Sequence, residues 1–164
     1  MIVRDAQPRD LPEILVIHNA AIVDTTANWD DEPTELPAYT EWFEQRRAQF
    51  PFLVAEIDGR VAGYASYAQW RPKTGYRHTV ENSVYVGADF QRRGVASALL
   101  AELISRARTA GLHAIVAGIE SGNLGSIKLH EQFGFRIVGQ LPEVGTKFGR
   151  WLDLTLMQLS LDAA

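Results

Sequence analysis

The sequence predicts one α/β domain of the α+β type, in which a mixed, mostly antiparallel central sheet carries helices on both faces. Segments with the apolar pattern of strands alternate along the chain with segments whose apolar residues recur at helical spacing. At 164 residues, of which 46% are hydrophobic, the chain is long enough to bury one core. No linker, low-complexity tract or internal repeat divides it, so we expect a single domain over residues 1–164.

The amino-terminal part is predicted to form a short strand followed by two helices. Ile2 and Val3 suit the strand, and Asp10 is predicted to cap the first helix, with Glu13 reaching back in a capping box. Apolar residues at helical spacing from 36 to 43 predict the second helix, which ends before Pro51.

Three strands are predicted in the middle of the chain. Asp58-Gly59 marks a tight hairpin turn between strands at 52–57 and 60–67, because both residues tolerate positive φ. A β-branched and aromatic segment at 79–86 predicts the next strand. It leads into a loop at 91–96 and then into a helix whose C-cap is Gly111.

The carboxyl-terminal part is predicted to hold three strands and a short helix. The continuous apolar run at 114–119 is typical of a strand that is covered on both faces. A helix at 126–133 follows, and then strands at 135–141 and 151–161 with a loop containing Gly and Lys between them. The apolar phase changes within 151–161, which predicts a bulge in that last strand.

Composition excludes several classes of function. With 20 acidic and 16 basic residues the net charge is −4, which argues against nucleic acid as a partner. The chain has no cysteine, so disulfides, thiolate metal sites and a cysteine nucleophile are excluded. The histidines lack the spacing of metal ligands, and we expect no metal. No apolar stretch is long enough to span a bilayer, so we expect a cytoplasmic protein without membrane contact.

The loop Gln91-Arg92-Arg93-Gly94-Val95-Ala96 has the features of an anion site. It joins a strand to the start of an amphipathic helix, where unpaired N–H groups and the helix dipole attract negative charge. The glycine and arginines could equally belong to an ordinary solvated turn. The loop lacks the Gly-Lys-Ser/Thr ending of a Walker loop and the three glycines of a dinucleotide fold, so neither of those nucleotide sites is favoured.

Two motifs resemble those of the GNAT superfamily of N-acetyltransferases. Gln91-x-x-Gly94-x-Ala96 resembles the superfamily's pyrophosphate loop, and residues 123–135, from Asn123 to Gly134-Phe135, resemble its asparagine loop and the helix after it. The resemblance covers nearly the whole chain. Segments 79–86 and 144–153 are similar to the phosphinothricin and methionine sulfoximine acetyltransferase branch.

The resemblance implies a GNAT-like fold, acetyl-CoA as the acetyl donor and a homodimer. It also implies that β-strand backbone groups pair with the pantetheine arm, and that one N–H polarises the thioester carbonyl. The residues predicted to bind the donor are Val84, Tyr85, Val86, Gln91, Arg92, Arg93, Gly94, Val95, Ala96, Ser97, Asn123 and Ser126.

Two residues are candidates for catalysis. Glu81, an ionisable residue in an otherwise apolar strand, is the candidate general base, because the acceptor ammonium must lose a proton before it attacks the thioester. A solvent-facing strand glutamate is the alternative. His130 stands where many superfamily members have a tyrosine that protonates the departing thiolate, and the phosphinothricin branch commonly has histidine there. It is either a proton donor or a packed, cofactor-contacting residue.

The loop at 70–77 is the predicted carboxylate clamp for an amino-acid acceptor, since arginine binds carboxylates bidentately and aromatic rings can wall an apolar side chain. Ordinary loop charges are the alternative for its arginines. The predicted acceptor-binding residues are Trp70, Arg71, Gly75, Tyr76, Arg77 and Lys147, and Trp29 is a further candidate.

We therefore expect direct acetyl transfer, without a covalent enzyme intermediate, to the α-amino group of a small amino acid or analogue such as methionine sulfoximine, methionine sulfone or phosphinothricin. One rival hypothesis keeps the donor but takes a polyamine, an antibiotic amine or a protein amino terminus. The other is a non-catalytic acyl-CoA sensor.

Overall fold

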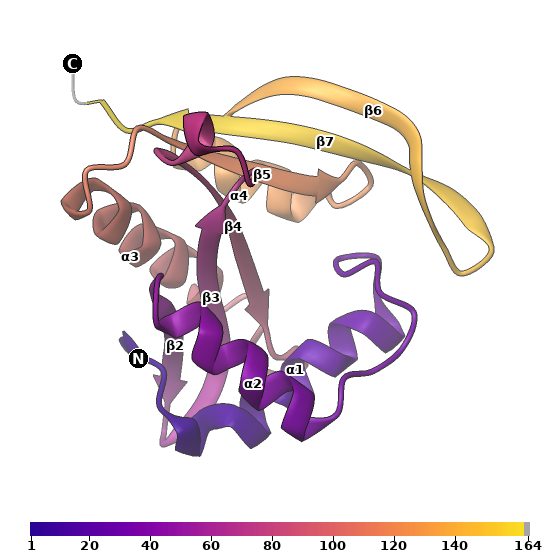
Figure 1. Ribbon diagram of the computed structural model, residues 1–164. Helices are drawn as coiled ribbons and strands as arrows, with labels where there is room; N and C mark the ends of the chain where they lie inside the picture. Colours follow the sequence, from indigo (N-terminus) through magenta and orange to yellow (C-terminus); the bar gives the residue numbers. More distant parts are fainter. Residues whose placement is uncertain (163–164) are drawn as a thin grey trace.

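A seven-stranded sheet forms the centre of the protein in a computed structural model that describes residues 1–162 (Figure 1). In spatial order its strands are β1 (Ile2–Asp5), β2 (Phe52–Ile57), β3 (Arg60–Gln69), β4 (Thr79–Val86), β5 (Ala114–Glu120), β7 (Arg150–Ser160) and β6 (Arg136–Lys147). Among the described residues only β4 and β5 pair in parallel, which confirms the predicted mixed, mostly antiparallel sheet. Residues 163 and 164 of the predicted domain lie outside the described residues.

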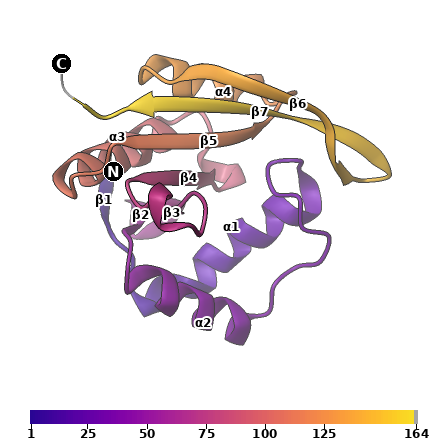
Figure 2. The same ribbon diagram turned by 45° about the horizontal axis from the view of Figure 1, so that its top comes forward.

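Helices cover both faces of this sheet, as predicted (Figure 2). Helices α1 (Leu11–Asp24) and α2 (Leu36–Arg47) pack on one face, around buried Ile14, Phe43 and Tyr64. Helices α3 (Val95–Thr109) and α4 (Leu124–Gln132) pack on the other, where α3 contributes buried leucines. Three short 3-10 helices, η1 (Pro8–Asp10), η2 (Thr74–Tyr76) and η3 (Ala88–Phe90), connect these elements.

The sheet opens between β4 and β5. These strands pair over only three residues of β4, from Thr79 to Glu81, although β4 continues to Val86 and β5 to Glu120. Figure 1 shows β5, β7 and β6 running across the view while β3 and β4 run nearly upright. We call the space between residues 82–86 of β4 and residues 117–120 of β5 the wedge. Backbone groups along both of its sides have no partner strand across it.

Gly63 of β3 places the start of α3 against the sheet. A Cβ atom at this position would lie 2.7 Å from the Tyr85 carbonyl oxygen and 2.9 Å from Val95 Cγ1. Both distances are shorter than ordinary contacts, so only glycine lets the first turn of α3 come this close to β3 and β4. The amino terminus of α3 is thereby fixed beside the carboxyl end of β4.

The capping box predicted at Asp10 and Glu13 is wrong, although α1 begins directly after Asp10. The Asp10 carboxylate pairs with the Arg4 guanidinium at 2.8 Å and accepts the Gln7 N–H at 2.7 Å. The Glu13 carboxylate accepts the Val61 N–H of β3 at 3.1 Å. Both side chains thus bind groups other than the N–H groups at the start of α1.

Of the two carboxyl-terminal strands, β6 is longer than predicted, and β7 begins and ends one residue earlier than predicted. The segment between them, predicted as a loop, extends β6 to Lys147 and begins β7 at Arg150, so only Phe148 and Gly149 remain as the turn. The register shifts lie in β6, at 137–139 and 141–145, whereas β7 pairs regularly with β5 over residues 154–160. The bulge predicted in the last strand is therefore wrong. β7 has apolar residues on both faces because both faces are partly covered.

Candidate active site

The wedge opens into a cavity of about 580 Å³ between the ends of β4 and β5, the loop before α3, and α4. This volume is in the range of small-molecule sites. The predicted donor-binding residues that line it are Val84, Tyr85, Val86, Gln91, Arg92, Gly94, Val95, Ala96, Ser97, Asn123 and Ser126. Arg93 does not line it; its guanidinium lies over the Phe90 ring at 5.6 Å. Segments far apart in the sequence thus meet around one cavity.

The residues 91–97 form a cradle suited to an anion. Arg92 and Gly94 have positive φ, of 60° and 78°, and Gly94 is the N-cap of α3. The first bond of this helix runs from Ala98 N–H to the Gly94 carbonyl oxygen at 3.0 Å, so the preceding N–H groups have no acceptor within the helix. These donors, the helix dipole and the exposed Arg92 favour a phosphate at this place.

Gly94→Val is expected to raise the dissociation constant for coenzyme A by about 10-fold, because the left-handed conformation costs a side-chain-bearing residue about 1–2 kcal/mol. Apart from the adjoining residues, no atom in the described part of the chain lies within 4 Å of a Cβ added here, so the effect comes from backbone conformation. Titration calorimetry measures it. Gly59→Val is the matched control, since Gly59 has a similar φ of 76° and equally open surroundings in the β2–β3 turn. Equal coenzyme A affinity in the two variants would contradict the assignment of residues 91–97 as the phosphate-binding segment.

Asn123 is the N-cap of α4 and faces the same cavity. Its side-chain Oδ1 accepts the Ser126 N–H at 3.2 Å and so caps the helix. Its amide nitrogen donates to no side chain or carbonyl among residues 1–162, which leaves this N–H₂ group for a ligand in the cavity. The predicted donor contact at Asn123 is compatible with this geometry and stays a prediction.

Glu81 is the last residue of β4 that pairs with β5, and its carboxylate lies where the wedge begins. A Cβ atom added to Gly118 of β5 would be 3.0 Å from the Glu81 Oε2 atom, so a side chain at position 118 would require the carboxylate to shift. The side chain keeps contact with solvent, but the surrounding protein still withdraws enough water to raise the pKa of Glu81. The positive charge of Arg71 opposes this increase.

Tyr85 lies on the same face of β4 as Glu81, four residues along the strand. Its ring stacks on Tyr64 at 5.3 Å between centroids. Desolvation, with the carboxylates of Asp30 and Glu81, raises the pKa of Tyr85 to about 12. The phenol therefore stays protonated and can donate a hydrogen bond at neutral pH.

His130 of α4 is buried at the inner end of the cavity. Its Nδ1 lies 2.7 Å from the Ser126 carbonyl oxygen, and its Nε2 lies 3.1 Å from the Asn82 side-chain nitrogen. The ring packs edge-on against Phe135. Burial lowers the pKa of His130, and the hydrogen bond to the Ser126 carbonyl partly opposes this.

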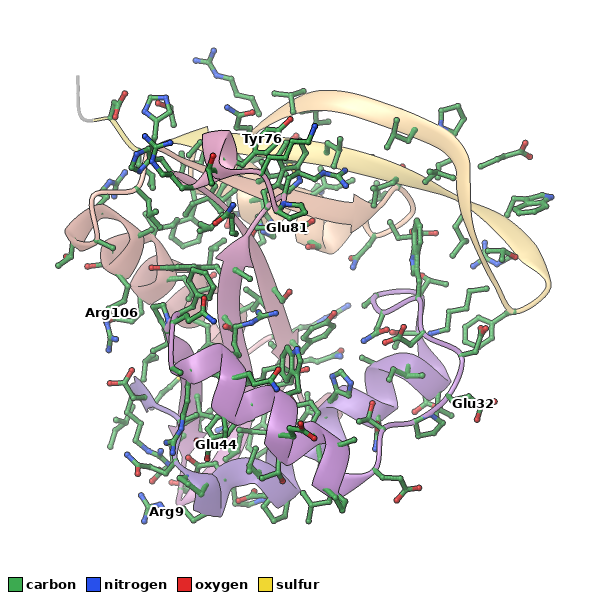
Figure 3. The ribbon with its side chains drawn as sticks, viewed as in Figure 1. Arg9, Glu32, Glu44, Tyr76, Glu81 and Arg106 are labelled. Carbon is green, nitrogen blue, oxygen red and sulfur yellow. The ribbon has the colours of Figure 1, made fainter. Side chains whose placement is uncertain are left out.

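The predicted acceptor loop lies before β4 and outside the cavity lining. Trp70 and Tyr76 pack edge-to-face at 5.3 Å, and the Arg71 guanidinium lies 4.8 Å from the Trp70 ring. Arg77 donates to the Thr74 carbonyl oxygen within the loop at 3.0 Å. Gly75 has no neighbour within 4 Å of an added Cβ. Figure 3 shows Tyr76 and Glu81 at the same end of the view, opposite Glu44 and Arg9.

Lys147, the last predicted acceptor contact, is buried at the end of β6. Its ammonium donates to the Asn28 carbonyl oxygen, and desolvation lowers its pKa while Asp30 and Asp31 oppose the change. The neighbouring Trp29 ring lies directly on Gly145 of the same strand. Together these contacts hold the α1–α2 loop on the β6–β7 hairpin, and the structure does not bring Lys147 together with Arg71.

Sequence reasoning missed Asn82, Ser83, Phe90 and Gly118, which also line the cavity. Gly118 interrupts the apolar run of β5, and this interruption is the feature of the sequence that could have identified it as a site residue. Asn82 is polar in an apolar strand, as Glu81 is, but only the strand divergence shows where it points. Within residues 1–162, no three His, Asp or Glu side chains gather as a metal ion would require. No helix in the same range is both long and apolar enough to cross a membrane.

The fold and this cavity define an acetyltransferase. The sequence model of the acetyltransferase (GNAT) family matches residues 14–135, which include the wedge and the cradle. The chain belongs to the GNAT family, and the resemblance inferred from its two motifs is confirmed.

Similar proteins indicate which kinds of acetyltransferase this chain resembles. The L-methionine sulfoximine/L-methionine sulfone acetyltransferase of Pseudomonas aeruginosa is 55% identical over 98% of this chain and 94% of its own length. A GNAT superfamily phosphinothricin acetyltransferase from Sinorhizobium meliloti, solved in complex with acetyl-CoA, has a TM-score of 0.94 at 32% identity, covering 97% of this chain and 87% of that one. The ribosomal-protein-alanine N-acetyltransferase from Brucella melitensis has a TM-score of 0.96 at 47% identity, covering 98% and 99%. The prediction of an acyl-transferring enzyme is thus confirmed.

Proposed function

We propose that this protein transfers the acetyl group of acetyl-CoA to the α-amino group of a small amino acid or analogue, of the methionine sulfoximine, methionine sulfone or phosphinothricin type. The observation that carries the proposal is the Glu81 carboxylate, which lies over Gly118 at the point where β4 and β5 separate. A base at this point is next to the place where an acceptor amine would approach the thioester of acetyl-CoA bound in the wedge.

The cavity offers suitable contacts to two parts of coenzyme A, the pyrophosphate and the pantetheine arm. The cradle at 91–97 offers N–H donors and arginine charge to a pyrophosphate, and the open backbone of the wedge offers hydrogen bonds to an amide-bearing arm. When bound, acetyl-CoA supplies the acetyl group as an activated thioester. The chain must therefore align the two substrates, remove a proton and stabilise the charge that develops on the carbonyl oxygen.

Glu81 supplies the proton acceptor in this proposal. Its raised pKa keeps the carboxylate basic enough to take a proton from an ammonium group directly or through water. Backbone N–H groups of β4 between Asn82 and Val86, which have no partner across the wedge, can stabilise negative charge on the acetyl oxygen. No side-chain nucleophile is required, because the amine attacks the acetyl carbon itself.

Arg71 is the proposed partner of the acceptor carboxylate, since its charge acts on Glu81 and it is held over Trp70. Arg71→Gln is expected to raise KM for the amino acid by about 10- to 100-fold, as a hydrogen bond to a charged group contributes about 1.5–3 kcal/mol. The acid limb of the pH profile should also move to higher pH, because Arg71 lowers the pKa of Glu81. Lys73→Gln is the control for an exposed cation in the same loop.

A screen of acceptors with acetyl-CoA tests the function itself. Thiol release is expected with methionine sulfoximine, methionine sulfone or phosphinothricin. The name of the Brucella relative favours a second candidate, the amino terminus of a peptide that begins with alanine, so such a peptide belongs in the panel. Release with this peptide alone would replace the amino-acid proposal. Absence of release with every amine would leave only the rival hypothesis of an acyl-CoA sensor.

We also propose that the protein is a homodimer in the cytoplasm. β6 is an edge strand, and large apolar side chains on it are exposed, namely Ile137, Val138, Leu141 and Val144. A long apolar edge favours pairing with a second copy. A monomeric mass in light scattering would contradict this part of the proposal.

A further inference from the structure

Asn82 is the first residue of β4 beyond its pairing with β5. Because side chains alternate along a strand, it points to the face opposite that of Glu81. The residue is only 8% exposed, and it lines the inner part of the cavity. A buried polar side chain at the point where two strands separate needs a hydrogen-bond partner.

The partner of Asn82 comes from the other side of the wedge. Its Nδ2 atom lies 3.1 Å from Nε2 of His130, which is 4% exposed and belongs to α4, the helix that follows β5. The hydrogen bond therefore connects β4 to the β5–α4 unit at the inner end of the opening. It is the kind of contact that fixes how far apart the two sides stand.

The direction of this hydrogen bond follows from the other ring nitrogen. The Ser126 carbonyl oxygen, 2.7 Å from Nδ1, can only accept, so Nδ1 carries a proton. A neutral imidazole has one N–H group, so Nε2 accepts from the Asn82 amide. Burial favours the neutral form, and among the described residues no charged side chain shifts the pKa of His130. This orientation leaves Asn82 Oδ1 without a partner, an exception that indicates a functional constraint.

We propose that the Asn82–His130 hydrogen bond is a brace that sets the width of the wedge for the pantetheine arm, with His130 a neutral acceptor and not the proton donor to the thiolate. The inference rests on the proposed donor, acetyl-CoA. The protons balance without an acid at His130. The acceptor ammonium gives one proton to Glu81 before attack, and the nitrogen gives a second to the departing thiolate after the C–N bond forms. Asn82 and His130 are positioning residues in this account.

Asn82→Asp tests the brace, because the new carboxylate can pair with His130 only when the imidazole is protonated. The carboxylate should raise the pKa of His130. Below that pKa the imidazolium donates to the carboxylate and the brace is present, whereas above it two acceptors face each other. The ratio of variant to wild-type dissociation constants for coenzyme A is therefore expected to rise about 10-fold between about pH 6 and about pH 8. A ratio that does not change with pH would overturn the brace.

Two controls distinguish a loss of positioning by Asn82 and His130 from misfolding of the variant and from failure of the proposed function. The nucleotide part of coenzyme A, which has the phosphates but no pantetheine arm, should bind to the variant and the wild type equally at each pH. A pH-dependent ratio for this fragment as well would overturn the inference. If the wild type binds neither ligand, the proposed function fails first and the brace with it.

His130→Gln keeps a neutral hydrogen-bond acceptor and removes the ionisable group. It should bind coenzyme A about as tightly as the wild type, because the Asn82 amide keeps an acceptor, whereas His130→Leu should weaken coenzyme A binding. General acids typically contribute a factor of about 100 or more to kcat. A loss of that size in the glutamine variant would overturn the proposal that His130 acts as a neutral hydrogen-bond acceptor.

Discussion

Glu81→Gln is expected to lower kcat by about 100- to 10,000-fold, the usual contribution of a positioned general base. Glutamine keeps the shape of the side chain over Gly118 but cannot accept a proton from the ammonium group. KM for acetyl-CoA should change little, because the cradle at 91–97 is untouched. Steady-state thiol release measures both constants.

The pH dependence of kcat/KM gives a second measure of the same residue. Desolvation raises the pKa of Glu81, with Arg71 opposing, and only the deprotonated carboxylate acts as a base. Activity should therefore fall as the pH decreases through this raised pKa, and Glu81→Gln should lack that acid limb. Glu131→Gln, on the exposed side of α4, is the control and should match the wild type. Wild-type kinetics in Glu81→Gln would remove Glu81 from the mechanism.

Gly118→Val is expected to lower kcat/KM by about 100-fold, the effect of a displacement of about 1 Å at a reacting group. A Cβ atom at 3.0 Å from Glu81 Oε2 already forces the carboxylate to move, and the two methyl groups would extend into the wedge. The same activity assay measures this effect.

Gly139→Val is the matched control for Gly118→Val. Gly139 is also a strand glycine, but its nearest neighbour, Leu156 Cδ1, is 3.9 Å from an added Cβ, which is an ordinary contact. This variant should keep both activity and thermal stability. Full activity in Gly118→Val would show that the carboxylate does not need the space above Gly118.

Local sequence patterns predicted most secondary-structure elements correctly. The bounds of β2 and β4 match the predicted segments, and Asp58 and Gly59 have the positive φ expected of the turn between β2 and β3. These features depend on residues close in sequence. The cap at Asp10 failed because Arg4 provides a charged partner that helix-end rules do not include. The carboxyl-terminal hairpin was underestimated because residues 142–147 of its edge strand, which include proline, glycine and lysine, resemble a loop.

The site was predicted unevenly for a similar reason. The cradle residues follow one another in the chain, so a motif could identify them. Lys147 was predicted as an acceptor contact, yet its ammonium bonds to Asn28, more than a hundred residues away. Gly118 and Asn82 gain their roles from the separation of β4 and β5, which no local pattern records.

By itself, the sequence determined the order of strands and helices, the position of the loop at 91–96 before the third long helix, and membership of a family that transfers acetyl groups. Those properties reside in contiguous segments whose backbone conformation follows from nearby residues. Only the tertiary structure decided that β4 and β5 separate after Glu81, that the carboxylate lies over Gly118 and that His130 faces Asn82. Each of these depends on distances between distant segments, which are set by packing.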